Sequence, residues 1–312
     1  MSEREELTQA VKDVALRYGA ALVGVANVER FDPMPPYGDA APQGHHPRDF
    51  LPETRSTISI AQPILDGVLD APARLNERPL EMIPDHIKSA FMDTVYSRVG
   101  HTLQDYMLEF IGQMVGQFLM AKGYQAMIFP TTGQHPRPEG WTEKEIWHGR
   151  GDKKGNPFKY TYGPFSHRHA ATRAGLGEFG YNNVLLTPQF GPRQRINTIL
   201  TDAELTPDPL LAEPLCLRDK CKLCLKVCYM DALSMRDDEE KRDYRSVDKV
   251  DSGVIFIDTP AKSDPNLCMA RKEGRESWPT RGDCIRVCPI PVTRKRHLTE
   301  RLKRVIAGQP AE

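Results

Sequence analysis

The sequence predicts an α/β protein in two parts, a mixed domain over residues 1–210 and a cysteine-containing module over residues 211–312. Helical and strand-like hydrophobic patterns alternate through the first part, which is typical of α/β folds. All seven cysteines lie between Cys216 and Cys288. With 312 residues, the chain is long enough to bury a full core in one large domain or two smaller ones.

Hydrophobic periodicity locates the elements of the first part. Apolar residues recur at helical spacing in three segments, residues 3–18, 87–122 and 166–174. Strand-like runs are predicted at residues 20–28, 57–63, 124–129, 184–187 and 196–201. Residues 32–47 and 130–164 are predicted loops, and the second is long enough to serve as a lid or substrate loop. Near the end of the module, residues 294–306 are predicted to form a basic helix.

Charge and hydropathy narrow the function classes. The chain has 42 basic and 42 acidic residues, so a domain held on nucleic acid by bulk positive charge is not expected. It contains no apolar run of 18 residues, so no membrane partner or span is expected. Residues 1–7 are acidic and resemble neither a secretory nor a twin-arginine signal. From this we expect a cytoplasmic protein.

The cysteines are the clearest functional signal in the sequence. An odd number of clustered cysteines in a cytoplasmic chain favours metal binding over a disulfide framework. They form two runs, Cys216-x4-Cys221-x2-Cys224-x3-Cys228 and Cys268-x15-Cys284-x3-Cys288-Pro289. In two-cluster ferredoxins, the fourth cysteine of each run binds the other iron–sulfur cluster. On that pattern the first cluster has four ligands, Cys216, Cys221, Cys224 and Cys288. The second has Cys228, Cys268 and Cys284.

The second run departs from the ferredoxin spacing. Arg281 occupies the position three residues before Cys284, where a thiolate is expected. The second centre is therefore predicted to be a three-iron cluster, or a four-iron cluster with a non-cysteine ligand such as Asp283. Zinc is the alternative, because Cys221-x2-Cys224 alone is a common zinc spacing. The crossing pattern, the Cys288–Pro289 pair and the lack of nearby histidines favour iron–sulfur clusters.

One segment carries a family resemblance. Residues 165–193, FSHRHAATRAGLGEFGYNNVLLTPQFGPR, followed by ILTD at 199–202, resemble the corrinoid-binding part of reductive dehalogenases and are similar to epoxyqueuosine reductases. Residues 50–54 and 96–122 also resemble this superfamily, and the likeness covers roughly residues 5–292. It implies a nitroreductase-like domain that binds cobalamin base-off, followed by a ferredoxin-like module whose clusters deliver single electrons to form Co(I).

The resemblance also implies a set of residues around the corrinoid. They are Ser166, His167, Gly175, Leu176, Gly177, Phe179, Gly180, Thr187, Phe190, Gly191 and Arg193. Because glycine has no Cβ, Gly175 and Gly177 would let the backbone approach a planar cofactor, although a helix-end turn would also use them. A histidine at 167 or 169 would be able to ligate cobalt, but the superfamily leaves that position without one, so hydrogen bonding is expected there.

Catalytic residues are implied in the same way. Dehalogenase-like sites place a lysine or arginine beside a tyrosine that donates a proton. Here Arg193 would supply the positive charge, which lowers the cost of an anionic tyrosinate or leaving group. The tyrosine is expected to be Tyr162 or, failing that, Tyr160, because both lie at the end of the long loop before residue 165.

Together these features predict a corrinoid-dependent iron–sulfur reductase that acts on an organic small molecule and receives electrons from ferredoxin or flavodoxin. Three alternatives stay open. An epoxyqueuosine reductase-like enzyme would modify tRNA, but the sequence reads Pro130-Thr131-Thr132 where that family carries a catalytic aspartate, and only a short segment follows Cys288. A reductase using FMN is the second alternative, and a non-catalytic electron-transfer protein is the third.

Overall fold

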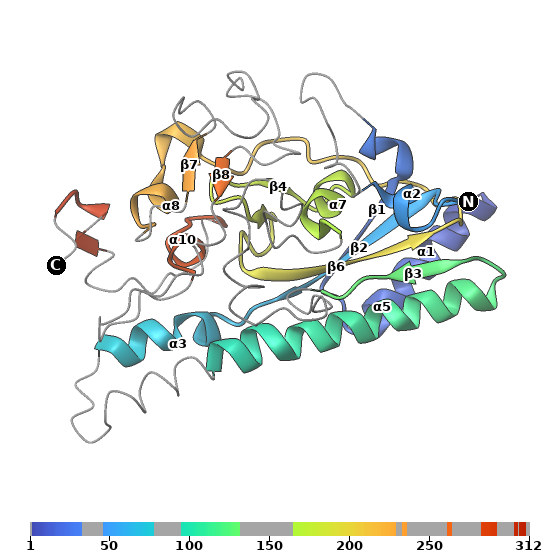
Figure 1. Cartoon of the computed structure of the whole chain (residues 1–312), viewed down its shortest axis with the longest axis horizontal. Helices are drawn as coiled ribbons and strands as arrows, with labels where there is room; N and C mark the ends of the chain where they lie inside the picture. The colour runs from blue at the N-terminus through green and yellow to red at the C-terminus, as the bar shows by residue number, and fades with distance from the viewer. Residues whose placement is uncertain are drawn as a thin grey trace, which may run out of the picture.

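The computed structural model describes residues 2–32, 46–77, 95–131, 165–228, 233–235, 261–263, 282–291, 303–304 and 306–309. Figure 1 shows a central sheet with helices on both faces and the short helices of the cysteine module gathered at one end. None of the helices in these ranges is long and apolar enough to cross a lipid bilayer.

The centre of the fold is a four-stranded antiparallel sheet with the order β1-β2-β6-β3. Its strands are β1 (Leu22–Asn27), β2 (Ser56–Pro63), β6 (Gln194–Thr201) and β3 (Ala126–Ile128). β2 pairs with β6 along its whole length, from Ser56 opposite Thr201 to Pro63 opposite Gln194. Every residue of β2 except Pro63 is buried, because the sheet is covered on both faces.

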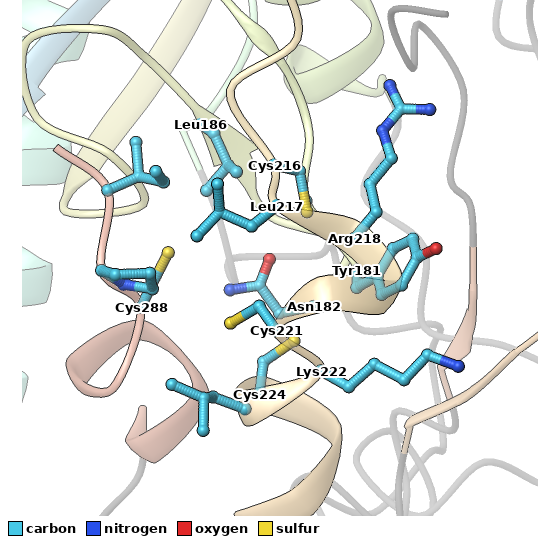
Figure 2. Close-up of a pocket in the computed structure, with 14 residues that line it drawn as sticks. Tyr181, Asn182, Leu186, Cys216, Leu217, Arg218, Cys221, Lys222, Cys224 and Cys288 are labelled. Atoms are coloured by element: carbon cyan, nitrogen blue, oxygen red, sulfur yellow. The ribbon is translucent and has the colours of Figure 1, made fainter. Parts of the chain in front are cut away.

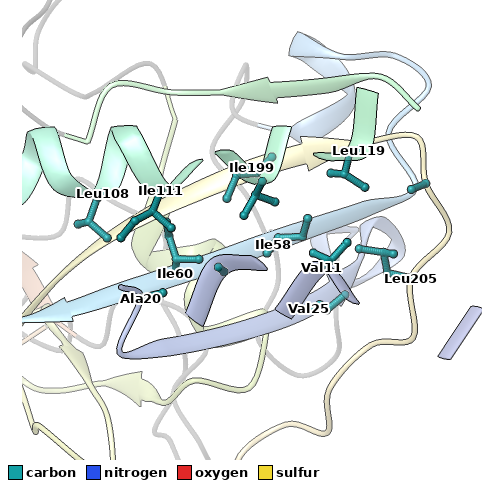
Figure 3. Packing of buried hydrophobic residues seen from close by; sticks show 13 residues of the cluster. Val11, Ala20, Val25, Ile58, Ile60, Leu108, Ile111, Leu119, Ile199 and Leu205 are labelled. Carbon is teal, nitrogen blue, oxygen red and sulfur yellow. The ribbon is translucent and has the colours of Figure 1, made fainter. Parts of the chain in front are cut away.

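Three helices cover the sheet, α1 (Glu3–Arg17), α5 (Leu103–Ala121) and α7 (His167–Arg173). Successive side chains of a strand point to opposite faces, and β6 shows this clearly. Ile199 packs with Val11 of α1 and Ile111 of α5 (Figure 3). Leu200 packs with Ala170 of α7 on the other face. The apolar core is therefore divided into two layers by β6 and its neighbours.

Local signals explain where these helices begin and how closely they pack. Ser2 caps α1 by accepting a hydrogen bond from the backbone N–H of Glu5, whose carboxylate in turn accepts from the N–H of Ser2. Gly19 follows the helix with a φ of 107°, a conformation that favours glycine. In α5, a Cβ added at Gly112 would lie 3.3 Å from Ile128, so this glycine lets the helix lie close against β3.

The predicted helices are found with shifted boundaries. Residues 3–18 contain α1, and residues 166–174 contain α7. The long stretch predicted at 87–122 is described from Val95 onward, where a π-helical segment, η2 (Val95–Thr102), precedes α5. Of the predicted basic helix, Lys303, Arg304 and Ile306 are helical, and the rest lies outside the described residues.

The predicted strands are also found. Residues 20–28, 57–63, 124–129 and 196–201 correspond to β1, β2, β3 and β6, and the segment 184–187 contains β5 (Leu185–Leu186). Elements that were not predicted include α2 (Pro47–Phe50), α3 (Asp66–Glu77) and β4 (Glu178–Phe179), which pairs with β5. A short 3-10 helix, η1 (Val28–Phe31), follows β1. The predicted loop at 130–164 is described only at Pro130 and Thr131.

The cysteine module contains a local repeat. Its described elements are η4 (Arg218–Lys220), α8 (Leu223–Lys226), β7 (Leu233–Met235), β8 (Ala261–Ser263) and α10 (Asp283–Arg286). α8 and α10 each begin after a residue in the left-handed region, Lys222 with φ 49° and Gly282 with φ 87°. A buried valine and a cysteine follow each helix, and Val227 and Val287 share one small apolar cluster. The C-terminal halves of the two cysteine runs therefore have the same local conformation.

His167 connects α7 to the sheet from a buried position, where 8% of its surface is exposed. Its Nε2 lies 3.1 Å from the carbonyl oxygen of Pro130, and its Nδ1 lies 3.1 Å from Oγ1 of Thr198. Because a carbonyl only accepts, Nε2 carries the proton and donates it, and neutral Nδ1 accepts from the threonine hydroxyl. Burial lowers the pKa of His167 from 6.5 to about 4, which keeps the ring neutral.

This burial predicts an acid-sensitive contribution to stability. Between the unfolded pKa of 6.5 and the folded pKa of about 4, the unfolded chain binds a proton that the folded chain does not. Stability conferred by neutral His167 is therefore lost as pH falls through this window, by about 2 kcal/mol between pH 7 and pH 5. Urea unfolding of the wild type and of His167→Gln at the two pH values measures it. The difference in unfolding free energy between pH 7 and pH 5 should be smaller in the variant than in the wild type. An equal pH dependence in both proteins would contradict the assignment.

Candidate metal centre

Four of the seven cysteines line one cavity. They are Cys216, Cys221, Cys224 and Cys288, and Figure 2 shows their sulfur atoms directed toward the space between them. The space not filled by protein atoms is about 370 Å³, part of which opens to solvent. The other walls are formed by Gly180, Tyr181, Asn182, Leu186, Leu217, Arg218, Lys222, Leu223, Pro289 and Ile290.

The structure brings together the ligand set that the sequence predicts for the first cluster. Cys288 comes from the second run and joins three thiols of the first, as the crossing pattern requires. Of the remaining cysteines, Cys228 and Cys284 are half-buried and do not line this cavity, and Cys268 lies outside the described residues. Within the described ranges, no three Cys, His, Asp or Glu side chains converge on one ion position. The four thiols thus surround a space rather than a point.

The thiols of the cavity are electrostatically coupled. Burial, with smaller contributions from the neighbouring Cys216, Cys288 and Cys221, raises the pKa of Cys224 to about 12. Burial likewise raises the pKa of Cys288 to about 11, although the backbone N–H of Ile290 and the charge of Arg193 oppose this shift. Burial therefore opposes ionisation of Cys216, Cys224 and Cys288, and a bound metal centre would supply the positive charge that favours their thiolate forms.

The segment that carries Cys216 is held by a buried carboxylate. Glu178 of β4 is fully buried, and its Oε1 accepts hydrogen bonds of 2.6 Å from the backbone N–H groups of Leu215 and Cys216. Its Oε2 lies 3.4 Å from the guanidinium of Arg218, which also lines the cavity. The sequence analysis did not identify Glu178, because a glutamate in a short apolar strand carries no signal of this contact.

The segment that carries Cys288 is held by a buried guanidinium. Arg193 is 3% exposed, and it donates to the carbonyl oxygens of Arg286 at 3.1 Å, Cys288 at 3.1 Å and Ile290 at 3.0 Å. A carboxylate oxygen of Asp66 in α3 lies 3.8 Å from its Nε. The sequence predicts Arg193 beside a substrate or corrin ring. The structure shows its guanidinium bound to the backbone of residues 286–290.

The glycines that were expected to face a cofactor face the chain itself. A Cβ at Gly175, Gly177 or Gly191 would overlap the carbonyl oxygen of Pro209, Leu186 or Ile290, respectively. Gly180 lies against Asn182 and Leu186, and it lines the cysteine cavity. Glycine is required at these positions because backbone segments meet there, and Gly175 and Gly191 also have positive φ values of 74° and 57°.

The other residues expected around a corrinoid also have partners within the chain. His167 uses both ring nitrogens, so neither is left to ligate cobalt. Ser166 Oγ lies 2.6 Å from Nδ1 of His169, and Thr187 Oγ1 lies 3.2 Å from Oε1 of Gln194 and accepts from the N–H of Phe190. Leu176 and Phe179 are buried in apolar clusters. Phe190 is half-buried.

Asp283, the expected non-cysteine ligand of the second centre, already has a cationic partner. Its Oδ1 accepts from Nη1 of Arg286 at 2.5 Å. Arg286 is 1% exposed, lies 3.3 Å from Asp70 and donates to the carbonyl oxygen of Leu69. This network fastens α10 to α3, so its visible role is to attach the second cysteine run to the α/β part.

The proposed proton donors Tyr160 and Tyr162 lie outside the described residues. The sequence analysis places the catalytic aspartate of epoxyqueuosine reductases at residues 130–132, and none of these three residues is acidic in this chain. A carboxylate from α5 contacts this segment. Oε1 of Glu109 accepts a hydrogen bond of 2.9 Å from the backbone N–H of Thr131. A scan along the sequence misses this residue because it is 22 positions away from its partner.

Comparisons with known proteins find similarity to reductive dehalogenases over parts of the chain. No family model matches the chain. Over 71 residues it is 44% identical to the tetrachloroethene reductive dehalogenase of Desulfitobacterium hafniense, which covers 22% of this chain and 12% of that protein. Over 127 residues it is 28% identical to the enzyme of the same name from Sulfurospirillum multivorans, covering 38% of this chain and 22% of that protein. The matches thus span less than a quarter of the relatives' own length.

Solved structures extend the likeness beyond those segments. A catabolic reductive dehalogenase in complex with 3-bromo-4-hydroxybenzoic acid matches with a TM-score of 0.52 and 16% identity, over 98% of this chain and 34% of that chain. An epoxyqueuosine reductase with a tRNA stem loop matches with a TM-score of 0.46 and 18% identity, over 73% and 52%. This chain is thus similar in fold to a catabolic reductive dehalogenase along most of its length, and similar in sequence to tetrachloroethene reductive dehalogenases over limited segments.

Proposed function

We propose that this protein is an oxidoreductase of the reductive dehalogenase type, in which Cys216, Cys221, Cys224 and Cys288 hold a four-iron cluster that serves the reduction of an organic small molecule. The observation that carries this proposal is the meeting of thiols from both cysteine runs around one cavity. Iron–sulfur cubanes take four cysteine thiolates spread around a cluster, whereas zinc draws its ligands to one point at about 2.3 Å.

The residues around the cavity fit such a centre. When bound, the cluster supplies single-electron transfer at a potential set by charge, hydrogen bonds and solvent exposure. The apolar side chains of Leu186, Leu217 and Ile290 limit water on several sides, and Glu178 and Arg193 fix the two segments that bring thiols from the two runs. The protein's part is to hold the four sulfur atoms in place and to control the local charge.

A second cluster is proposed on Cys228, Cys268 and Cys284. The repeat formed by α8 and α10 supports it, because each helix is followed by a valine and a cysteine in the same local conformation. The contact of Asp283 with Arg286 makes that carboxylate a poor replacement for the missing thiolate. We therefore propose a three-iron cluster in preference to a four-iron cluster with Asp283 as ligand.

We propose cobalamin as a cofactor because the reductases that this chain resembles in sequence and fold are cobalamin proteins. The glycines and His167 once expected to contact a corrin make their described contacts within the chain, so no corrin contact is assigned to them. Ferredoxin or flavodoxin as electron donor and a cytoplasmic location remain predictions from the sequence.

Paired cysteine variants test the ligand assignment. If the runs cross, Cys216→Ser and Cys288→Ser should remove or alter the same electron paramagnetic resonance (EPR) signal, because both thiols line one cavity. Cys228→Ser and Cys284→Ser should alter a different signal. The measurement is low-temperature EPR with iron and sulfide analysis of anaerobically reconstituted protein. A Cys288→Ser spectrum that matches Cys284→Ser and differs from Cys216→Ser would contradict crossing.

Cofactor loading tests the reductase proposal. Protein produced anaerobically with added hydroxocobalamin should bind it and, after partial reduction, give the EPR signal of base-off cob(II)alamin. Turnover with reduced viologen and a brominated phenol should then release bromide. The matched sample is the same protein supplied with FMN. Iron–sulfur signals with bound FMN and no bound cobalamin would replace the proposal with a flavin reductase, and clusters with neither cofactor would indicate an electron carrier.

A further inference from the structure

We propose that Arg193 and Glu178 are paired positioning residues that attach the two halves of the four-cysteine site to the α/β part and shift the reduction potential of its cluster in opposite directions. The inference rests on the proposed cluster at Cys216, Cys221, Cys224 and Cys288. It assigns new roles to two buried charges, one that sequence analysis placed at the substrate and one that it did not identify.

The positioning role follows from where the two side chains bind. Arg193 immediately precedes β6, the strand that pairs with the whole length of β2, so its backbone is fixed by the core of the sheet. Its guanidinium donates hydrogen bonds to the carbonyl oxygens of Arg286, Cys288 and Ile290, which lie in a five-residue stretch at the end of the second cysteine run. Glu178 of β4 holds two consecutive N–H groups, including that of Cys216.

Both contacts cross from one part of the chain to the other. Figure 2 shows Cys216 and Cys288 on different sides of the cavity, with their sulfur atoms directed inward. The carboxylate of Glu178 therefore holds Cys216, and the guanidinium of Arg193 holds Cys288. Both side chains bind the backbone of the cysteine and not its sulfur atom. Gly191 helps to attach the segment that carries Cys288, because its lack of a Cβ lets the carbonyl of Ile290 approach.

The potential shift follows from the signs of the charges. Reduction adds a negative charge to a cluster that is already anionic with its four thiolates. A nearby guanidinium stabilises the reduced form and raises the potential, whereas a nearby carboxylate lowers it. Arg193 is 3% exposed and Glu178 is fully buried, so water screens neither strongly. Asp66 near Arg193 is 41% exposed and offsets its charge only partly, and Arg218 offsets that of Glu178 at 3.4 Å.

The test uses substitutions that separate charge from hydrogen bonding. Arg193→Gln removes the positive charge and keeps a donor, and Glu178→Gln removes the negative charge and keeps an acceptor for the two N–H groups. Arg193→Lys keeps the charge but lacks the planar guanidinium that spans three carbonyls. Each variant is reconstituted anaerobically, its iron and sulfide are counted, and the cluster is titrated potentiometrically with EPR detection.

We expect Arg193→Gln to have a more negative potential and Glu178→Gln a more positive one. Each should change the ratio of reduced to oxidised cluster at a fixed ambient potential by about tenfold, equivalent to about 59 mV for a one-electron centre. Arg193→Lys should stay near the wild-type potential but lose cluster faster on exposure to a chelator, because it cannot fasten three carbonyls.

Arg173→Gln is the matched control. Arg173 is also fully buried and binds backbone carbonyls, those of Arg30 and His169, but none of these residues lines the cavity. This variant should lose stability and keep the cluster potential. If Arg193→Gln loads no cluster while Arg173→Gln loads normally, the positioning role is supported, and Glu178→Gln with Arg193→Lys completes the test of charge.

Two outcomes would overturn the inference. One is that fully loaded Arg193→Gln and Glu178→Gln shift the potential in the same direction or not at all. The other is that Arg193→Lys and Arg173→Gln retain cluster against the chelator equally well. A wild-type protein that binds no iron–sulfur cluster is a different result, since it would refute the proposed function before any variant is compared.

Discussion

The contact on which the four-cysteine cavity depends is that of the Arg193 guanidinium with the backbone of residues 286–290. Cys288 is distant in sequence from the other three thiols of the cavity, and short cysteine spacing alone cannot bring it to them. Arg193 does so from the position just before β6, the strand that pairs with β2 along its whole length. Donating to three carbonyls satisfies most of a buried guanidinium that would otherwise be costly to desolvate. The geometry of the site is thus set by the sheet.

The sequence predicted what depends on local spacing. The strands of the main sheet and the helices α1, α5 and α7 followed from periodicity, and the four-cysteine set followed from the crossing pattern of two-cluster ferredoxins. It did not predict what depends on tertiary placement. Gly175 and Gly191 were expected to contact a cofactor, and each faces a carbonyl from a segment far along the chain, that of Pro209 or Ile290. Neither the contact of Glu178 nor α3 carried a recognisable pattern.

The two cysteine runs illustrate how a repeat is used asymmetrically. α8 and α10 begin from left-handed residues and end in a valine and a cysteine, and the two valines pack together. Their attachments differ, however. Arg286 fastens α10 to Asp70 and Leu69 of α3, with Asp283 as an internal partner, and no equivalent acidic residue precedes Cys224, where Leu223 stands. The second run is therefore the more heavily anchored half of a nearly symmetrical unit.

The buried attachments also limit how this protein can be rebuilt. A ferredoxin-like module from another protein would meet Arg193, Glu178 and Gly191 on the α/β part, and each of them requires a specific backbone group at a specific place. A module without matching carbonyl and N–H groups would remove hydrogen bonds from two opposite buried charges. The two parts are distinct in sequence composition, yet in assembly they form one unit, and neither can be exchanged without redesigning the surface of the other.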